Sequence, residues 1–309
     1  MKKIFIDGSA GTTGLRIFGR LSPRTDLALL TLPEEQRKDS AARAHALNEA
    51  DIVILCLPDA AAREAVSMIE NPDTVVLDTS TAHRTAPGWV YGFPELSAAH
   101  AAAIRTAKRI AVPGCHAGGF IALTAPLRAA GVLPAGTLLS CFSLTGYSGG
   151  GKKMIAEYEA TPRPAAFDAP RQYALGQAHK HLPEMAAVSG LPAPAFCPVV
   201  GDFYSGMQVT VPLFAAQCAP GTTKETIAEI YRATYRGPVV RFTETPDEGG
   251  FLFAAALAGK DSMKISVSGN GERMLLLAVY DNLGKGASGA ALECLNMILG
   301  ADPCEGLCL

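Results

Sequence analysis

The sequence lacks several features that mark whole classes of protein. Its 309 residues carry 27 basic and 29 acidic side chains, so no excess of one sign would attract nucleic acid or an anionic membrane surface. No apolar run reaches the length that crosses a bilayer, and no internal repeat or low-complexity segment is evident. We therefore expect a globular protein with no nucleic-acid or membrane partner, large enough for two domains.

The cysteines also lack a pattern. Eight of them lie at scattered positions without a single C-x-x-C pair, which suits reduced thiols better than a disulfide framework. Cys304 and Cys308 could bind a metal, but a frayed tail explains them better, and we predict no metal site. Met1-Lys2-Lys3 leads directly into a predicted strand, so we expect no secretion signal and a cytoplasmic location.

Apolar runs of strand length alternate with helical patterns in the first third of the chain. Strands are predicted at 2–6, 27–30, 51–57 and 74–78, and helices at 15–21, 60–69 and 96–106. This alternation predicts an α/β fold whose amino-terminal part, residues 1–115, is a Rossmann-like doubly wound parallel sheet.

The rest of the chain is richer in strands. Strands are predicted at 138–144, 207–214, 239–242, 264–267 and 274–280, with a helix at 224–235. Residues 116–285 are therefore predicted to form a second α+β domain with a mixed or antiparallel sheet. Prolines 162, 164 and 170 predict a loop without regular structure over 161–170.

Cys115 is the strongest candidate for a catalytic residue. An apolar strand ends at Val112-Pro113-Gly114-Cys115, and a helix is predicted to begin near Gly118. Unpaired N–H groups at a helix start would favour the thiolate, which can attack an acyl carbon. The alternative is that Cys115 is a small apolar core residue.

A glycine turn follows the first strand and precedes the first helix. Its spacing is G-x-x-G-x-x-G, and its members are Gly8, Ser9, Ala10, Gly11, Thr12, Thr13 and Gly14. Such a turn lets the backbone approach a pyrophosphate at the positive end of a helix, so we predict a dinucleotide site rather than a plain turn.

The choice of dinucleotide depends on the segment after the second strand. Arg37 and Lys38 could accept a 2′-phosphate, which favours NADP, whereas Glu34 and Glu35 keep NAD possible. The other interpretation is that these charged residues lie on a solvated surface and bind no cofactor.

Two histidines, His179 and His181, are candidates for the proton carrier. Residues two apart share one face of an extended strand, and Pro183 favours an extended segment before it. The pair could instead be structural or part of a metal site, but no nearby carboxylate or cysteine cluster completes such a site.

Taken together, the motifs resemble the N-acetyl-gamma-glutamyl-phosphate reductase family in its shorter form, over nearly the whole chain. The resemblance rests on the glycine turn and on Asp78–Arg84, Tyr91–Leu96, Pro113–Cys115, Gly146–Lys152, His179–Glu184 and Asp281–Ala287. It implies an NADPH-dependent reduction of an acyl phosphate to an aldehyde in arginine biosynthesis. It also implies a homo-oligomer, a dimer or tetramer, and a carboxy-terminal helix, 286–309, that returns to the nucleotide domain.

The resemblance assigns roles to individual residues. Cys115 is the nucleophile that forms a thioester, and His179 is favoured over His181 as acid and base, although spacing alone cannot separate them. Ser80 and Asn282 are expected to contact the cofactor; Asn282 ends a predicted strand, and strand carboxyl ends face the ligand crevice in such sheets. Candidates for binding the anionic substrate are Arg84, Arg109, Ser148 and Lys152.

Two other functions remain open at this point. An aspartate-semialdehyde type of dehydrogenase would use the same cysteine and histidine on a different acyl substrate. A non-enzymatic NADP-binding sensor would not need Cys115 at all.

Overall fold

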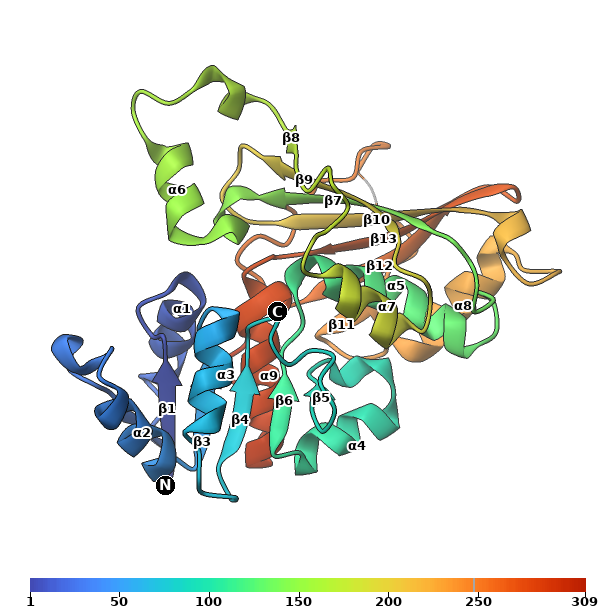
Figure 1. Cartoon of the computed structure of the whole chain (residues 1–309). Coiled ribbons are helices and arrows are strands. Elements are labelled where there is room, and N and C mark those ends of the chain that lie inside the picture. Colours follow the sequence, from blue (N-terminus) through green and yellow to red (C-terminus); the bar gives the residue numbers. More distant parts are fainter. Residues whose placement is uncertain (247) are drawn as a thin grey trace.

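The computed structural model, which describes residues 1–246 and 248–309, consists of two sheets with helices around them (Figure 1). The strands of the first sheet point their carboxyl ends toward the second sheet. Ligand sites are therefore expected in the region between the two sheets, where the crevice of an open α/β sheet lies.

The first sheet is parallel throughout. Its order is β2-β1-β3-β4-β6-β5, and all neighbouring strands run in the same direction. The strands are β1 (Lys2–Asp7), β2 (Leu27–Leu30), β3 (Ile52–Leu55), β4 (Val75–Asp78), β5 (Val90–Tyr91) and β6 (Arg109–Ala111). The predicted doubly wound sheet is confirmed, with β5 as a short unpredicted edge strand.

Helices cover both faces of this sheet because the strand residues are apolar on both sides. Ile4 and Ile6 of β1 lie in a core with residues of α1, α4 and α9, whereas Phe5 lies in a second core with residues of α2 and α3. The bounds are α1 (Thr12–Leu21), α2 (Ser40–Glu49), α3 (Asp59–Ser67), α4 (Ala98–Thr106) and α9 (Gly289–Leu299).

The carboxy-terminal helix α9 returns to the first sheet, against which it packs (Figure 1). A π-helical segment, Gly284–Ser288, precedes it where the sequence predicted one continuous helix from residue 287. This segment brings Gly286 against the nucleophile candidate: a Cβ on Gly286 would lie 3.0 Å from the Cβ of Cys115.

The second sheet is mixed, one of the two predicted arrangements, with the order β11-β12-β13-β10-β7-β9-β8. The pairs β11/β12 and β7/β9 are parallel and the other neighbours antiparallel. The strands are β7 (Ser140–Gly146), β8 (Arg171–Gln172), β9 (Ala195–Gly201), β10 (Met207–Phe214), β11 (Val240–Phe242), β12 (Met263–Gly269) and β13 (Arg273–Tyr280). Strand β9 was missed because Pro198 interrupts its apolar pattern.

Helices α5 (Cys115–Ala129), α7 (Leu182–Ser189) and α8 (Lys224–Thr234) share one core with the second sheet. Helix α5 begins at Cys115, three residues earlier than predicted, so Gly118 and Gly119 lie inside it. The close approach of Tyr280 explains why residue 119 is a glycine, because an added Cβ would lie 2.5 Å from the tyrosine hydroxyl oxygen.

Two segments of the second half contain helices that the sequence did not predict. Helix α6 (Gly151–Glu159) follows the glycine run after β7, and a 3-10 turn forms at Ala165–Asp168. The prediction that the prolines exclude regular structure from 161–170 is therefore wrong for four residues, because Pro164 stands just before the turn, where a missing N–H costs nothing. No helix in the described part of the chain is both long enough and apolar enough for a membrane crossing.

Candidate active site

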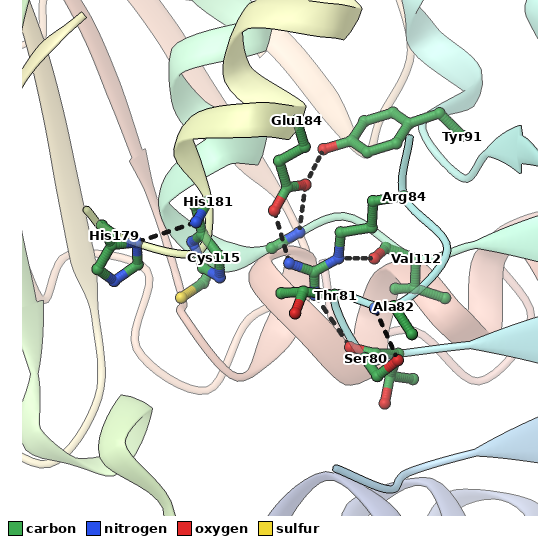
Figure 2. Close-up of polar contacts among 12 residues, drawn as sticks. Ser80, Thr81, Ala82, Arg84, Tyr91, Val112, Cys115, His179, His181 and Glu184 are labelled. Carbon is green, nitrogen blue, oxygen red and sulfur yellow. Dashed lines mark hydrogen bonds and ion pairs between the residues drawn. The ribbon is translucent and has the colours of Figure 1, made fainter. Parts of the chain in front are cut away.

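A cavity of about 400 Å³ lies between the two sheets. Its lining comes from segments far apart in the sequence: Thr12 and Thr13, Arg84, Val112–His116, Gly146 with Ser148–Gly151, Tyr173, His179–His181 and Asn282. The fold thus brings Cys115, both candidate histidines and the end of the glycine turn into one site. Figure 2 shows Cys115, the two histidines and the polar contacts beside them.

Cys115 is the first residue of α5 and lies half-buried in the cavity wall. Burial raises the pKa of its thiol to about 11, although the charge of Arg84 and a hydrogen bond from the backbone of His116 act in the opposite direction. The helix start favours the thiolate as expected, through the His116 N–H, but the cost of desolvating the charged sulfur is larger. Cys115 is a neutral thiol near pH 7.

Glu184 holds the backbone beside the nucleophile. Its carboxylate accepts hydrogen bonds from Arg84 Nη1 (2.6 Å), the Tyr91 hydroxyl (2.8 Å) and the N–H of Gly114 (3.1 Å), as Figure 2 shows for the labelled residues. A Cβ on Gly114 would lie 2.5 Å from Glu184 Oε1 and 2.7 Å from His181 Cε1, and would overlap Arg84 Nη1. Glycine is therefore required before the cysteine, since three side chains converge at this point.

The two candidate histidines lie in a turn, not in an extended strand. His181 is the N-cap of α7 in a right-handed helical conformation, and Pro183 stands in the first turn of that helix. The predicted extended segment is wrong because proline is also favoured at a helix start, where its missing N–H has no partner to lose. The turn nevertheless brings the rings together, with centroids 4.7 Å apart.

Their hydrogen bonds distinguish the two rings. The backbone N–H of His181 donates to Nδ1 of His179 (3.1 Å), so His179 carries its proton on Nε2 when neutral. The ring of His181 is buried, and its Nδ1 has no partner among the described residues. Burial lowers the pKa of His179 to about 4 and holds the pKa of His181 well below its usual value, so both rings are neutral.

His116 is a third histidine of the site that the sequence analysis missed. It is almost fully buried, and burial lowers its pKa to about 3. Its Nδ1 lies 2.7 Å from Ser143 Oγ and its Nε2 lies 2.7 Å from the Tyr173 hydroxyl oxygen. The only sequence signal was its position directly after Cys115, while its partners come from β7 and from the segment that follows β8.

Asn282 and Ser148, predicted to contact cofactor and substrate, both line the cavity. Asn282 Nδ2 donates to Ser148 Oγ (3.0 Å), and its Oδ1 accepts the N–H of Gly206 (3.0 Å). The amide therefore ties the loop after β7 to the loop before β10 while facing the site.

A second cavity of about 440 Å³ lies at the glycine turn. Its lining includes Gly8, Ser9 and Ala10 together with Arg37 and Lys38. Gly8 adopts φ +86°, and a Cβ there would overlap the carbonyl of Cys56, so the turn needs glycine at this position. A backbone turn at a helix start beside two cations fits a phosphorylated dinucleotide.

A third hollow is lined by Gly11, Thr12 and Thr13 of the glycine turn and by Ser80. Gly11, Thr12 and Thr13 surround the start of α1, where no side chain caps the free N–H groups. Ser80 donates to Asp78 Oδ2 (2.7 Å) and lies in the wall of the same hollow. These contacts place Ser80 beside the glycine turn, although its hydroxyl is engaged by the protein.

Four cations can be compared as anion ligands. Arg84 lines the main cavity, but it already donates to Glu184, to Val112 O (2.9 Å) and to Thr79 O (2.9 Å), which leaves two of its N–H groups. Lys152 lines the adjacent hollow. Lys180, which the sequence analysis did not select, lines both spaces and makes no hydrogen bond or ion pair in the described structure.

The prediction for Arg109 is wrong. It begins β6, and its guanidinium donates to the carbonyls of Thr74 (2.8 Å) and Lys108 (3.0 Å). These residues lie at the amino-terminal edge of the parallel sheet, whereas the site lies at the carboxyl edge. Arg109 is close to Cys115 in sequence, but Arg109 begins β6 and Cys115 follows the end of that strand, so the two residues lie at opposite edges of the sheet.

Comparison with known proteins agrees with this geometry. Residues 30–104 match the family model described as semialdehyde dehydrogenase, NAD binding domain, and residues 115–282 match semialdehyde dehydrogenase, dimerisation domain. A protein of Rhizobium meliloti (strain 1021) named N-acetyl-gamma-glutamyl-phosphate reductase is 48% identical over 97% of this chain and 99% of its own length. The chain belongs to the N-acetyl-gamma-glutamyl-phosphate reductase family. A protein of the same name from Burkholderia ambifaria is 46% identical over 96% of both chains.

Solved structures show the same fold at much lower identity. An aspartate semialdehyde dehydrogenase II from Vibrio cholerae superposes with a TM-score of 0.73 at 16% identity, covering 97% of this chain and 98% of that one. An aspartate semialdehyde dehydrogenase from Candida albicans gives a TM-score of 0.66 at 15% identity, covering 97% of this chain and 99% of that one. The N-acetyl-gamma-glutamyl-phosphate reductase family thus shares its two-sheet architecture with the semialdehyde dehydrogenases.

Proposed function

We propose that the protein reduces N-acetyl-glutamyl 5-phosphate to N-acetyl-glutamate 5-semialdehyde with NADPH, releasing phosphate, as a step of arginine biosynthesis. The observation that carries the proposal is the meeting of Cys115, His179 and His181 in one cavity next to the glycine turn. Family membership at 46–48% identity supports the choice of acyl substrate.

Cys115 acts as the nucleophile. Its thiol is neutral, so a base must take the proton as the sulfur attacks the acyl carbon. The carbon–sulfur bond forms while the bond from that carbon to the phosphate oxygen breaks. The product of this half-reaction is a thioester on Cys115, and the released phosphate takes up one proton from solvent.

We assign the proton transfer to His181, although the resemblance favoured His179. The hydrogen bonds support this: the lone pair at Nδ1 of His179 is already used by a backbone N–H, whereas Nδ1 of His181 has no partner among the described residues. Arg84 and His181 converge at Gly114, directly before the sulfur. After the thioester is reduced, the carbon–sulfur bond breaks, the carbonyl re-forms, and His181 returns the proton to the thiolate.

A bound reduced nicotinamide supplies the hydride. Gly8, Ser9, Ala10, Gly11, Thr12, Thr13 and Gly14 would hold its pyrophosphate, and Arg37 and Lys38 would hold a 2′-phosphate. Ser80 and Asn282 would line the nicotinamide end of the cleft. Replacing Arg37 and Lys38 by alanine should raise the KM for NADPH much more than that for NADH, whereas Lys153→Ala, at an exposed site on α6, should change neither.

The phosphate of the substrate would meet Arg84, Lys152 and Lys180, and Ser148 would bind from the loop after β7. The free N–H groups in the first turn of α5 are available to the developing oxyanion, because Gly114 provides no side-chain cap.

We further propose that residues 1–115 with 286–309 form the cofactor-binding domain and that 116–285 form the catalytic domain and the surface for a homo-oligomer, a dimer or tetramer. The dimerisation model that matches 115–282 supports this division. The eight free thiols support a reducing, cytoplasmic environment.

The test is phosphate-dependent reduction of NADP by N-acetyl-glutamate 5-semialdehyde, run beside aspartate semialdehyde. The proposal expects a clear preference for the former; the opposite preference would replace it by the aspartate-semialdehyde function. Cys115→Ser should abolish turnover while NADP binding is retained. A protein whose biological activity survives that substitution would be a sensor, not an enzyme.

A further inference from the structure

One wall of the main cavity contains a chain of three hydrogen-bonding side chains. Ser143 on β7 contacts Nδ1 of His116, and Nε2 of His116 contacts the hydroxyl of Tyr173, each over 2.7 Å. Ser143 is fully buried and His116 almost so, while Tyr173 is half-buried and lines the cavity. The proposed chemistry uses none of the three.

The chain has a preferred direction. A buried hydroxyl needs an acceptor for its proton, and among the described residues Ser143 has no partner other than Nδ1 of His116. Ser143 therefore donates to Nδ1, which places the single proton of the neutral imidazole on Nε2. Nε2 then donates to the Tyr173 oxygen, and the Tyr173 proton is left to point elsewhere.

The position of Tyr173 is fixed by its surroundings. Its backbone N–H donates to the carbonyl of Pro198 on β9 (3.0 Å), and its ring lies against those of His116 and His179. Burial raises the pKa of the Tyr173 phenol, so the hydroxyl keeps its proton. The free O–H thus belongs to a rigid, neutral donor at the cavity surface.

We infer that the Tyr173 hydroxyl donates a hydrogen bond to an acceptor oxygen on the acyl chain of the substrate, away from the reacting carbon, and that Ser143 and His116 set the direction of this bond. The inference rests on the proposed function. The glycine turn and the cations Arg84, Lys152 and Lys180 occupy the side where cofactor and phosphate would bind. Tyr173, directly after β8, lines the main cavity but not the hollow at the glycine turn, so its hydroxyl is available to the amide and carboxylate oxygens of the chain.

This assignment makes Tyr173 a specificity residue and Ser143 a positioning residue. Without the Ser143 hydroxyl, the imidazole can place its proton on Nδ1 and accept the Tyr173 proton at Nε2. Tyr173 would then present a lone pair, not a proton, to an anionic chain. A buried serine that touches no substrate should therefore alter substrate affinity.

The experiment measures KM and kcat for N-acetyl-glutamate 5-semialdehyde, phosphate and NADP. Tyr173→Phe should raise the KM for the semialdehyde about tenfold, the effect of one hydrogen bond to a charged or polar acceptor, with the KM for phosphate and NADP within about twofold. Ser143→Ala should raise the same KM severalfold. The double variant should be no worse than Tyr173→Phe alone.

Two comparisons separate this role from a structural one. Ser189→Ala removes another buried serine hydroxyl, which donates to the carbonyl of Met185 (2.6 Å), and should leave the KM for the semialdehyde unchanged. Butanal lacks the amide and carboxylate, so Tyr173→Phe should change its kcat/KM by less than about twofold. Binding of NADPH, followed by its fluorescence, verifies that each variant is folded.

The inference is overturned if Tyr173→Phe leaves the KM for the semialdehyde unchanged, if it weakens butanal equally, or if the losses of the two single variants multiply in the double variant. A wild-type protein that does not oxidise the semialdehyde would overturn the proposed function itself, and the inference with it.

Discussion

The backbone N–H of His181 donates a hydrogen bond to Nδ1 of His179 across 3.1 Å, so two adjacent imidazoles that look alike in sequence differ in chemistry. The bond fixes His179 as a ring with an occupied Nδ1. Nδ1 of His181 has no partner among the residues that the structure describes, and this ring lines the same cavity as Cys115. A proton carrier needs a free lone pair, and only the second ring has one without a change of tautomer.

This asymmetry predicts unequal effects of His181→Asn and His179→Asn. We expect His181→Asn to lower kcat by about 10²–10⁴, the range for loss of a general base, and His179→Asn to lower it by about tenfold or less. Steady-state kinetics across pH 5–9 measure both. The limb of the pH profile that reports the base should flatten in His181→Asn and persist in His179→Asn; the reverse ranking would return the role to His179.

The crowding at Gly114 predicts that a single methyl group there is harmful. In Gly114→Ala the Cβ would meet Glu184 Oε1 at 2.5 Å and His181 Cε1 at 2.7 Å, so the nucleophile must shift away from its base. We expect kcat/KM to fall by at least about 100-fold and the free energy of unfolding to fall by about 1–3 kcal/mol.

Gly118→Ala is the matched control in the same helix. Its Cβ would meet only Pro113 Cβ, at 3.8 Å, so the substitution should leave activity intact and stabilise the helix by about 0.5–1 kcal/mol. Urea unfolding measures the stability of both variants, and steady-state kinetics measure their kcat/KM. Equal effects of the two substitutions would contradict the geometry at Gly114.

The raised pKa of Cys115 predicts a particular pH dependence of alkylation. Only the thiolate reacts with iodoacetamide, and a pKa of about 11 leaves a small thiolate fraction at pH 7. The rate at Cys115, followed by mass spectrometry of its peptide, should therefore rise close to tenfold for each pH unit from 7 to 10. A plateau below pH 8 would show that the helix start and Arg84 outweigh burial after all.

The contrast between Lys180 and Arg109 predicts which cation serves the phosphate. Lys180 lines the cavity and has no hydrogen bond or ion pair to another described residue, whereas Arg109 donates to two carbonyls at the opposite edge of the sheet. Lys180→Gln should raise the KM for inorganic phosphate about tenfold in the semialdehyde oxidation, and Lys180→Arg should restore much of the loss. Arg109→Gln should leave that KM unchanged. An effect of Arg109→Gln equal to that of Lys180→Gln would refute this distinction.

Much of the fold could be predicted because its signals are local. The apolar runs of β1, β3 and β4 and the helical periods between them identify a parallel sheet, and the glycine turn indicates where β1 gives way to α1. Cys115 was identified in the same way, since a strand, a glycine and a helix follow one another in the chain. Strand patterns alone predicted a second sheet, either mixed or antiparallel, but they missed the two-residue β8 and also β9, which Pro198 concealed.

The sequence by itself determined the order of the elements, the glycine turn between β1 and α1 and the place of the proposed nucleophile at the start of a helix, because each of these depends on neighbouring residues. Only the tertiary structure decided that Arg109 faces away from the site, that His116 and Glu184 support it, and that the Cys115 thiol and all three imidazoles are neutral. These properties depend on which distant side chains share a buried space and on how much water they displace. The spacing of residues along the chain shows neither.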